Sequence, residues 1–220
     1  SNDCILEIGP GSGNLTSEIL VKNPKKIIVI EKDESLIPIL ANKFIDKLEI
    51  LNIDILKIDE KKLFKSKCKV FGNLPYNIST KILSKWILNL DKEPWFDEMY
   101  LMFQKEVAQR ICEKEGSKTY GILSVLTQAY YDAEYLFTVP PTVFNPPPKV
   151  DSGVLRLIRK EDYSLPVEQK LFFRVVKTAF QQRRKTLLNA IRKHYPEWFQ
   201  NCNEYLREKY DMRRPETLDF

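Results

Sequence analysis

The sequence predicts an α/β fold in which a mostly parallel sheet is followed by a small helical domain. Over the first two-thirds of the chain, short β-branched runs alternate with amphipathic helical patterns, as expected for a parallel sheet. A proline-rich stretch over 140–148 excludes a helix between the last two strands, which we therefore expect to pair antiparallel. From about residue 160 the patterns are helical only. The chain is thus predicted to form one domain at 1–160 and a helical domain at 161–220.

Seven strands and five helices are predicted in the first domain. The strands are short apolar or β-branched runs, at Cys4–Ile8, Lys26–Ile30, Leu48–Ile53, Lys69–Phe71, Glu98–Phe103, Glu134–Val139 and Gly153–Ile158. The helices have apolar residues at helical spacing, at Asn14–Lys22, Ser35–Phe44, Ser79–Leu90, Lys105–Glu113 and Tyr120–Tyr131. In the third helix, Ser79 is the expected N-cap. In the helical domain, apolar faces are expected at Leu171, Phe172, Val175, Val176, Ala179 and Phe180, and at Leu187, Leu188 and Ile191.

Composition excludes several classes of protein. The 220 residues are 43% hydrophobic, which is enough for one medium domain with a smaller appendage, and no apolar run approaches a membrane span. The net charge of +5 is too modest by itself to indicate a polyanionic partner. The four cysteines, Cys4, Cys68, Cys112 and Cys202, are scattered and His194 is the single histidine, so we expect free thiols and no metal site. A cytoplasmic monomer is expected.

A glycine-rich segment joins the first strand to the first helix. Glycines stand at 9, 11 and 13, within Glu7–Leu15, where they allow positive φ and close approach of a ligand. A dinucleotide site would need a glycine at position 14, where Asn14 stands. The spacing instead resembles the loop that binds S-adenosylmethionine (SAM). A purely structural turn remains the alternative for these glycines taken alone.

Two acids follow the next two strands. Glu31 closes the second strand, where its carboxylate can accept hydrogen bonds from both hydroxyls of a ribose. An NAD site would also place an acid here, and a solvated charge is the structural alternative. Asp54 ends the third strand, and in SAM-dependent enzymes an acid at this place faces the adenine amine of the cofactor. A helix-capping or surface Asp is the alternative there.

Asn73-Leu74-Pro75-Tyr76 follows the fourth strand and is the most specific motif in the chain. At the carboxyl end of a strand it should face the ligand crevice. The amine of adenine is a poor nucleophile, because its lone pair is delocalised into the ring. The Asn73 side-chain oxygen and the Leu74 carbonyl can accept the two amine hydrogens, with Pro75 fixing their geometry and Tyr76 stacking on the base. The motif therefore predicts adenine methylation without a charged general base; a polar turn is the alternative.

The sequence resembles the KsgA/RsmA family of ribosomal RNA adenine dimethyltransferases. The matching stretches run through the chain in family order, at Glu7–Thr16, Val29–Asp33, Phe71–Thr80, Phe103–Arg110, Tyr120–Val125, Phe144–Leu157 and Phe180–Leu187. The resemblance implies a Rossmann-like class I SAM-dependent methyltransferase fold with a seven-stranded sheet. It implies dimethylation of the N6 amines of two adjacent adenines in a hairpin near the 3′ end of small-subunit rRNA, with S-adenosylhomocysteine as product and a role in ribosome biogenesis.

The resemblance also assigns residues to the site. The expected cofactor contacts are Glu7, Gly9, Gly11, Glu31, Lys32, Asp54, Ile55 and Asn73. The Phe144–Lys149 segment is expected near the flipped base, with Phe144 as a second stacking residue. The family normally has a segment with a Gln-Asn-Phe-Leu motif ahead of the glycine loop, and nothing here corresponds to it. We therefore expect this chain to bind SAM weakly or not at all in calorimetry, and a version carrying that segment to bind well.

The helical tail is basic. Residues 170–196 contain eight Lys or Arg and no Asp or Glu. Arg183, Arg184 and Lys185 interrupt two apolar helix faces, which suits phosphate contacts with a folded RNA. A solvated helix surface is the alternative, and the absence of acids favours RNA.

Two other functions share this fold. An Erm-type enzyme acting on large-subunit rRNA is one, although the FNPPPKVDS and QRRKTL stretches favour the small-subunit enzyme. A noncatalytic assembly or transcription factor is the other, and the intact Asn73–Tyr76 motif argues against it.

Overall fold

The computed structural model describes residues 2–89, 95–160, 168–182, 184–192, 194–197, 209–210 and 212–218. The chain packs into two compact units, and each is built from two separate segments. The first contains residues 1–108 and 133–159, and the second contains 109–132 and 160–220. The domain boundary at residue 160 stays a prediction.

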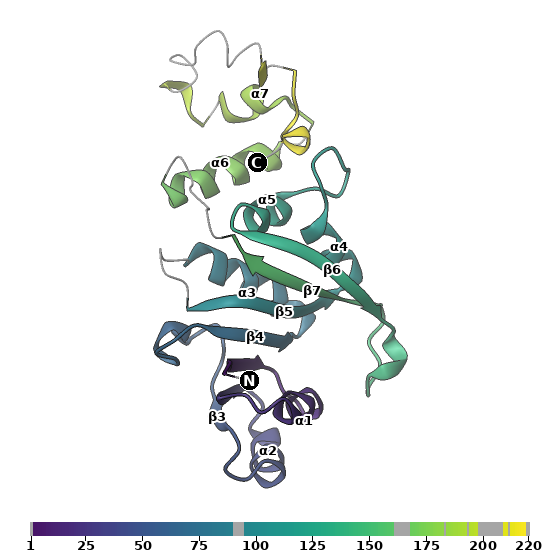
Figure 1. The fold of residues 1–220 in the computed structure, drawn as a ribbon. Helices are drawn as coiled ribbons and strands as arrows, with labels where there is room; N and C mark the ends of the chain where they lie inside the picture. The colour runs from purple at the N-terminus through teal and green to yellow at the C-terminus, as the bar shows by residue number, and fades with distance from the viewer. Residues whose placement is uncertain are drawn as a thin grey trace. The chain divides into compact units, whose positions relative to one another are not determined.

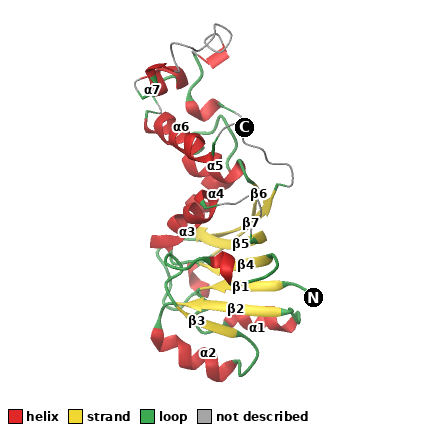
Figure 2. Cartoon of the chain, turned by 90° about the vertical axis from the view of Figure 1, so that its left-hand side faces the viewer, coloured by secondary structure: helices red, strands yellow, loops and turns green. Residues whose placement is uncertain are grey.

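A seven-stranded sheet forms the centre of the first unit. Its strands are β1 (Cys4–Ile8), β2 (Lys26–Glu31), β3 (Glu49–Asn52), β4 (Cys68–Asn73), β5 (Phe96–Gln104), β6 (Tyr131–Val139) and β7 (Ser152–Arg159). Figure 2 shows them stacked in the order β3-β2-β1-β4-β5-β7-β6. The pairs from β3 to β5 are parallel, and β7 runs antiparallel to β5. The mostly parallel sheet expected from the sequence is confirmed.

The order in which the chain adds strands to the sheet changes direction between β1 and β4. The strands before this point are added on one side of β1 and the later ones on the other. Ligands of such sheets bind outside the carboxyl ends of the strands at this switch point. The glycine-rich loop follows β1 and the Asn73–Tyr76 motif begins at the end of β4. Both therefore lie at the carboxyl ends of the strands, at the switch point.

Seven helices are assigned among the described residues: α1 (Asn14–Val21), α2 (Ile37–Lys43), α3 (Tyr76–Leu88), α4 (Lys105–Cys112), α5 (Ile122–Gln128), α6 (Gln169–Gln181) and α7 (Leu187–Arg192). Figure 1 labels them along the chain. The expected N-cap at Ser79 is wrong. Pro75, with φ of −57°, occupies the N-cap position, and α3 begins at Tyr76. The helix expected over Tyr120–Tyr131 is shorter, because Tyr131 begins β6.

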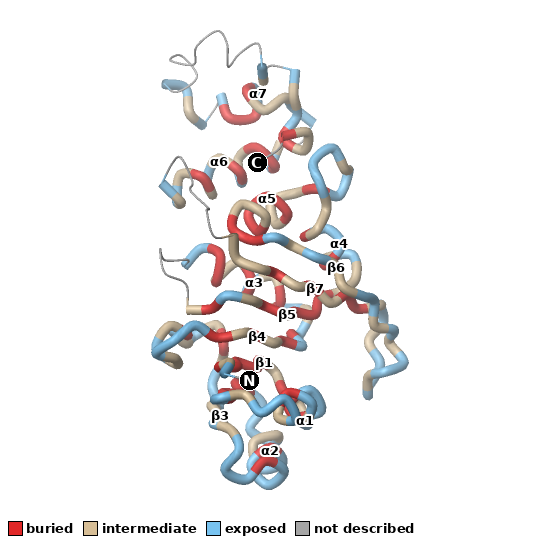
Figure 3. Tube along the Cα trace, viewed as in Figure 1, coloured by how far each residue is buried: buried red, intermediate tan, exposed pale blue. Residues whose placement is uncertain are grey.

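The core of the first unit forms around the central strands. Every residue of β1 is buried, as expected for a parallel strand covered on both faces. One apolar cluster joins Ile5, Ile27 and Val29 of the sheet to Ile19 of α1. In Figure 3 the buried colour follows β5 and α3 as well. The loops at the carboxyl ends of β1 and β4 therefore extend from a buried core.

The second unit contains the predicted helical tail. On α6, Phe172, Val176, Ala179 and Phe180 are buried, which confirms the apolar face expected there. The Phe180 ring lies 6.2 Å from that of Tyr120, which precedes α5. On α7, Leu188 and Ile191 are buried. None of the helices in the described part of the chain combines the length and the apolar character that a membrane crossing requires.

Candidate active site

The loop between β1 and α1 presents main chain to the carboxyl edge of the sheet. Gly9, Gly11 and Gly13 all have positive φ, at 67°, 58° and 78°. A Cβ added to Gly9 would lie 3.2 Å from the main-chain oxygen of Asn73, so the loop abuts the end of β4. A Cβ on Gly13 would overlap the Phe44 ring. Glycine is thus required at 9 and 13 for both conformation and space.

Lys43 ties the end of α2 to this loop. Its Nζ donates hydrogen bonds to the carbonyl oxygens of Ser12 at 3.0 Å and Gly13 at 3.2 Å. These carbonyls lie at the N-terminus of α1, so the Lys43 ammonium group and the Phe44 ring both contact the end of the loop.

Glu7 lies beneath the loop and is 1% exposed. Burial raises the pKa of its carboxyl to about 7, and the hydrogen bond from Thr16 Oγ1, at 2.7 Å, opposes that rise. Glu7 points from β1 to the same face of the sheet as Phe71, its partner on β4.

Carboxylates and one lysine gather at the ends of β2 and β3. Glu31 is 8% exposed, and it accepts hydrogen bonds from the main-chain nitrogens of Gly11, at 3.3 Å, and Asp33, at 2.9 Å. Lys32 Nζ lies 3.0 Å from Asp54 Oδ2. The Leu56 N–H and Lys32 lower the pKa of Asp54 by hydrogen bonding to its carboxylate. Glu31 therefore joins this cluster to the glycine loop.

Lys85 of α3 anchors the segment that carries Asp54 and Ile55. Its Nζ donates to the carbonyl oxygens of Ile55 at 2.8 Å and Ile58 at 2.6 Å, and it forms an ion pair with Glu60 Oε1 at 2.7 Å. Glu60 is 4% exposed and also accepts a hydrogen bond from the Trp86 indole at 2.9 Å. A buried carboxylate thus has two donors, and the loop after β3 is held against α3.

A cavity of about 730 Å³ opens between the glycine loop and the sheet. Four of the expected cofactor residues, Glu7, Gly9, Gly11 and Asn73, line it. The other four, Glu31, Lys32, Asp54 and Ile55, lie outside its lining, although Glu31 contacts the loop through Gly11. The remaining walls are Pro10, Ser12, Asn14, Leu15, Phe71, Gly72, Tyr100, Met102, Leu136, Phe137, Val139, Val143, Phe144, Asn145 and Val154.

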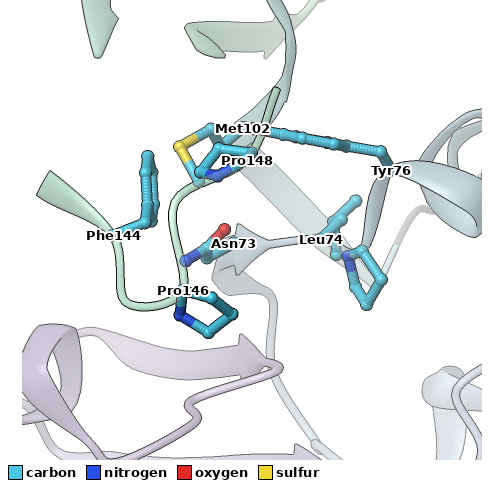
Figure 4. Close-up of a pocket in the computed structure, with 8 residues that line it drawn as sticks. Asn73, Leu74, Tyr76, Met102, Phe144, Pro146 and Pro148 are labelled. Atoms are coloured by element: carbon cyan, nitrogen blue, oxygen red, sulfur yellow. The ribbon is translucent and has the colours of Figure 1, made fainter. Parts of the chain in front are cut away.

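A smaller pocket of about 220 Å³ contains the Asn-Leu-Pro-Tyr motif. It is lined by Asn73, Leu74, Pro75, Tyr76, Met102, Phe144, Pro146 and Pro148. Figure 4 shows Asn73 between Leu74 and Phe144, with the Tyr76 ring extending toward Met102. Asn73, Met102 and Phe144 line both spaces. The pocket and the cavity therefore adjoin at Asn73.

The residues predicted to contact RNA are separated. Phe144 is half-buried and lines both spaces, whereas Lys149 is exposed and lines neither. Arg184 and Lys185 are exposed in the second unit. Arg183 lies outside the described residues. Their RNA contacts stay predictions.

Sequence reasoning missed several residues of the site, chiefly Met102 and Tyr100 of β5. Met102 pairs with Asn73 in the parallel register of β4 and β5, and the Tyr100 ring stacks on that of Phe71 at 5.0 Å. A signal existed, since the carboxyl end of β5 must lie beside that of β4 in a parallel sheet. Cys4, Cys68 and Cys112 are in no disulfide bond, and Cys202 lies outside the described residues. Among the described residues, no three or more potential ligands form a metal-binding group.

Comparison with known proteins places this geometry in a family. Residues 1–213 match the family described as ribosomal RNA adenine dimethylase. A relative from Flavobacterium johnsoniae, named ribosomal RNA small subunit methyltransferase A, is 51% identical over 98% of this chain and 80% of its own length. A relative of the same name from Pelagibacter ubique is 44% identical over 100% of this chain and 83% of its own.

Two solved structures share the fold. A dimethyladenosine transferase from Plasmodium falciparum has a TM-score of 0.80 and 27% identity, covering 100% of this chain and 86% of that one. The 23S rRNA methyltransferase ErmE has a TM-score of 0.67 and 26% identity, covering 90% of this chain and 78% of that one. The architecture is that of class I SAM-dependent methyltransferases, and the chain belongs to the ribosomal RNA adenine dimethylase family.

Proposed function

We propose that this chain dimethylates the N6 amines of two adjacent adenines in a hairpin near the 3′ end of small-subunit rRNA and thereby contributes to ribosome biogenesis. Family membership and the small-subunit activity named in the relatives support the reaction and the substrate. The observation that carries the proposal is the position of Asn73, which lines both the large cavity and the pocket of its own motif. An adenine there would meet the cofactor site directly.

The residues around the cavity fit SAM. Gly9 leaves too little room for a Cβ, and Gly11, also at positive φ, has open space above it, as expected where main chain contacts a ligand. We assign the cofactor contacts to Glu7, Gly9, Gly11, Glu31, Lys32, Asp54, Ile55 and Asn73. When bound, SAM supplies an electrophilic methyl group and leaves as S-adenosylhomocysteine.

The chain's own task is to hold the target amine. The Asn73 side-chain oxygen and the Leu74 carbonyl accept the amine hydrogens and turn the nitrogen lone pair toward the cavity. Tyr76 and Phe144 provide aromatic faces for the flipped base, and Pro75 limits the motif's conformations. The amine gives up its proton after the transfer, so no charged base is needed beside Asn73.

The rRNA partner also requires contacts outside the pocket. We assign phosphate contacts to Lys149, Arg183, Arg184 and Lys185, because cationic side chains that neutralise phosphates provide much of the affinity for RNA. We propose that the chain acts in the cytoplasm, on the assembling small subunit, and that it acts as a monomer.

Mass spectrometry of rRNA tests the proposal. Immature small and large subunits would be incubated separately with SAM and the version of the protein that carries the Gln-Asn-Phe-Leu segment, which we expect to bind SAM well. That version also serves as the wild type in the assays below. We expect dimethyladenine at two neighbouring positions of small-subunit rRNA only. Asn73→Ala should lower the rate at least about a hundredfold, since it removes an acceptor from the reacting amine, while circular dichroism shows an unchanged fold. Dimethyladenine in large-subunit rRNA alone would favour the Erm-type reaction, and no methylation of either would contradict the proposal.

A further inference from the structure

A hydrogen bond joins the two sides of the smaller pocket. The Tyr76 hydroxyl and Ser152 Oγ lie 2.5 Å apart. Tyr76 is the first residue of α3 and is half-buried, whereas Ser152 is the first residue of β7 and is 0% exposed. The two residues are 76 positions apart, so this contact connects separate parts of the chain.

Ser152 itself is held firmly. It pairs with Gln104 in the antiparallel register of β5 and β7. The preceding residue, Asp151, accepts a hydrogen bond from the Lys105 main-chain nitrogen at 2.9 Å, and its carboxylate lies 3.3 Å from Lys105 Nζ. The Tyr76 side chain is therefore attached to a fixed point on the sheet.

The position of this contact relates it to the target base. Ser152 follows the loop that places Phe144, Pro146 and Pro148 around the pocket, and Tyr76 lines the same pocket from α3. In Figure 4 the Tyr76 ring extends toward Met102, with Phe144 beyond it. A half-buried ring fixed at one end by its backbone and at the other by its hydroxyl has lost its freedom to swing about χ1.

We propose that Ser152 is a positioning residue, whose hydroxyl holds the Tyr76 ring as the stacking surface for the target base and matters most in the second methyl transfer. The inference rests on the proposed dimethylation. Each transfer replaces one N–H of the amine by N–CH3 and releases one proton. After the first transfer only one N–H remains, so only one of the Asn73 and Leu74 acceptors can be used. The orientation of the base then depends more on its stacking against the Tyr76 ring.

Three variants and one matched control test this assignment. Ser152→Ala and Tyr76→Phe each remove one partner of the hydrogen bond and keep the ring. In single-turnover assays we expect each to slow the second transfer about five- to tenfold and the first about twofold, so that monomethyladenine accumulates. The double variant should be no slower than either single one, because both remove the same contact. Ser124→Ala is the control, since Ser124 is also fully buried and donates a hydrogen bond, to the Arg110 carbonyl.

A second measurement needs no cofactor. Hairpin RNA with 2-aminopurine at a target position should show fluorescence quenching when it stacks on Tyr76. We expect at least twofold weaker quenching at saturating Ser152→Ala or Tyr76→Phe protein than with wild type or Ser124→Ala.

The outcomes separate this inference from the proposed function. Wild-type protein that methylates no rRNA contradicts the function. Normal dimethylation by the wild type, with the same product ratio and quenching in Ser152→Ala, overturns the role of Ser152 alone. Effects of Ser152→Ala and Tyr76→Phe that multiply in the double variant also overturn it, since Ser152 would then act through another contact.

Discussion

Two regions of the candidate active site, the glycine loop and the smaller pocket, present different chemical groups. The glycine loop presents main chain at three glycines with positive φ, and two of them, Gly9 and Gly13, have little space for a side chain. The smaller pocket is lined chiefly by side chains, namely two aromatic rings, three prolines and one methionine, beside Asn73 and Leu74. The loop forms within one β1–α1 connection, whereas the pocket brings together Tyr76 and Phe144 from distant segments.

Because of this difference, substitutions in the two regions should have different effects. A side chain added at Gly9 or Gly13 must displace backbone or a packed ring, so its cost appears in folding. A side chain removed from the pocket leaves the backbone in place, so its cost appears in substrate handling. The following predictions test that division, from the largest expected free-energy effect to the smallest.

Gly13→Ala should be the most destabilising. Its φ of 78° disfavours any side chain, and an added Cβ would overlap the Phe44 ring and lie 3.2 Å from Leu40 Cδ2. We expect a loss of roughly 3 to 4 kcal/mol in the free energy of unfolding, measured by urea denaturation. Gly116→Ala is the matched control, because Gly116 also has positive φ but nothing within 4 Å of an added Cβ. Equal losses in the two variants would show that the Phe44 contact contributes nothing.

Glu7→Gln should stabilise the protein in a pH-dependent way. Burial raises the pKa of Glu7 from 4.5 to about 7, so the folded protein binds this proton more tightly than the unfolded chain. Stability from this group is therefore lost as the pH rises from 4.5 through 7, and the variant escapes that loss. Its advantage over wild type should grow by roughly 2 to 3 kcal/mol between about pH 5 and about pH 8. Parallel stability curves would contradict the raised pKa.

Phe144→Ala should lower the activity on the RNA substrate and leave the fold unchanged. Phe144 is half-buried, and its ring forms one side of the smaller pocket. Loss of a stacking face costs roughly 2 kcal/mol, which corresponds to about a thirtyfold fall in kcat/KM for the RNA. Phe144→Tyr keeps the ring and should stay close to wild type. If both variants methylate rRNA equally well, the base does not stack on this residue.

Arg184→Ala combined with Lys185→Ala should have the smallest effect. Both residues are exposed, so folding should be unchanged. Binding to small subunits should weaken about two- to fivefold at physiological salt, and the slope of log affinity against log salt should flatten by about 1.5. Alanine at the exposed Lys25 and Lys47 provides a control with the same charge change. An identical slope in both double variants would show that Arg184 and Lys185 do not contact the RNA phosphates.

The sequence predicts the parts of the site that are continuous in the chain, but not the residues that long-range strand pairing adds to them. The bounds of β1 match the expected Cys4–Ile8, and Gly9 and Gly11 line the cavity at the end of that strand, because strand, turn and helix follow one another locally. Met102 and Ser152 belong to the site only through the registers of β5 with β4 and β7. Those registers are long-range pairings, and no local pattern specifies them.

The errors in the helices have local causes. Pro75 has a φ that suits a helix start, so α3 begins with Tyr76 and Ser79 donates its hydroxyl to the Tyr76 carbonyl inside the first turn. Tyr130 and Tyr131 fit a helical stripe in sequence, yet Tyr131 enters β6, where it is fully buried. Apolar periodicity cannot distinguish the two at such a junction.

The anchoring of α3 has a dynamic consequence. The helix carries Tyr76 at its first turn and Lys85 near its last, about 14 Å apart along its axis, and Lys85 holds the segment that follows Asp54. A rigid helix transmits a shift of either end to the other. We therefore expect thermal motion of the Tyr76 ring and of the Asp54–Ile58 segment to be correlated, so that a ligand bound at one end would slow hydrogen exchange at both ends.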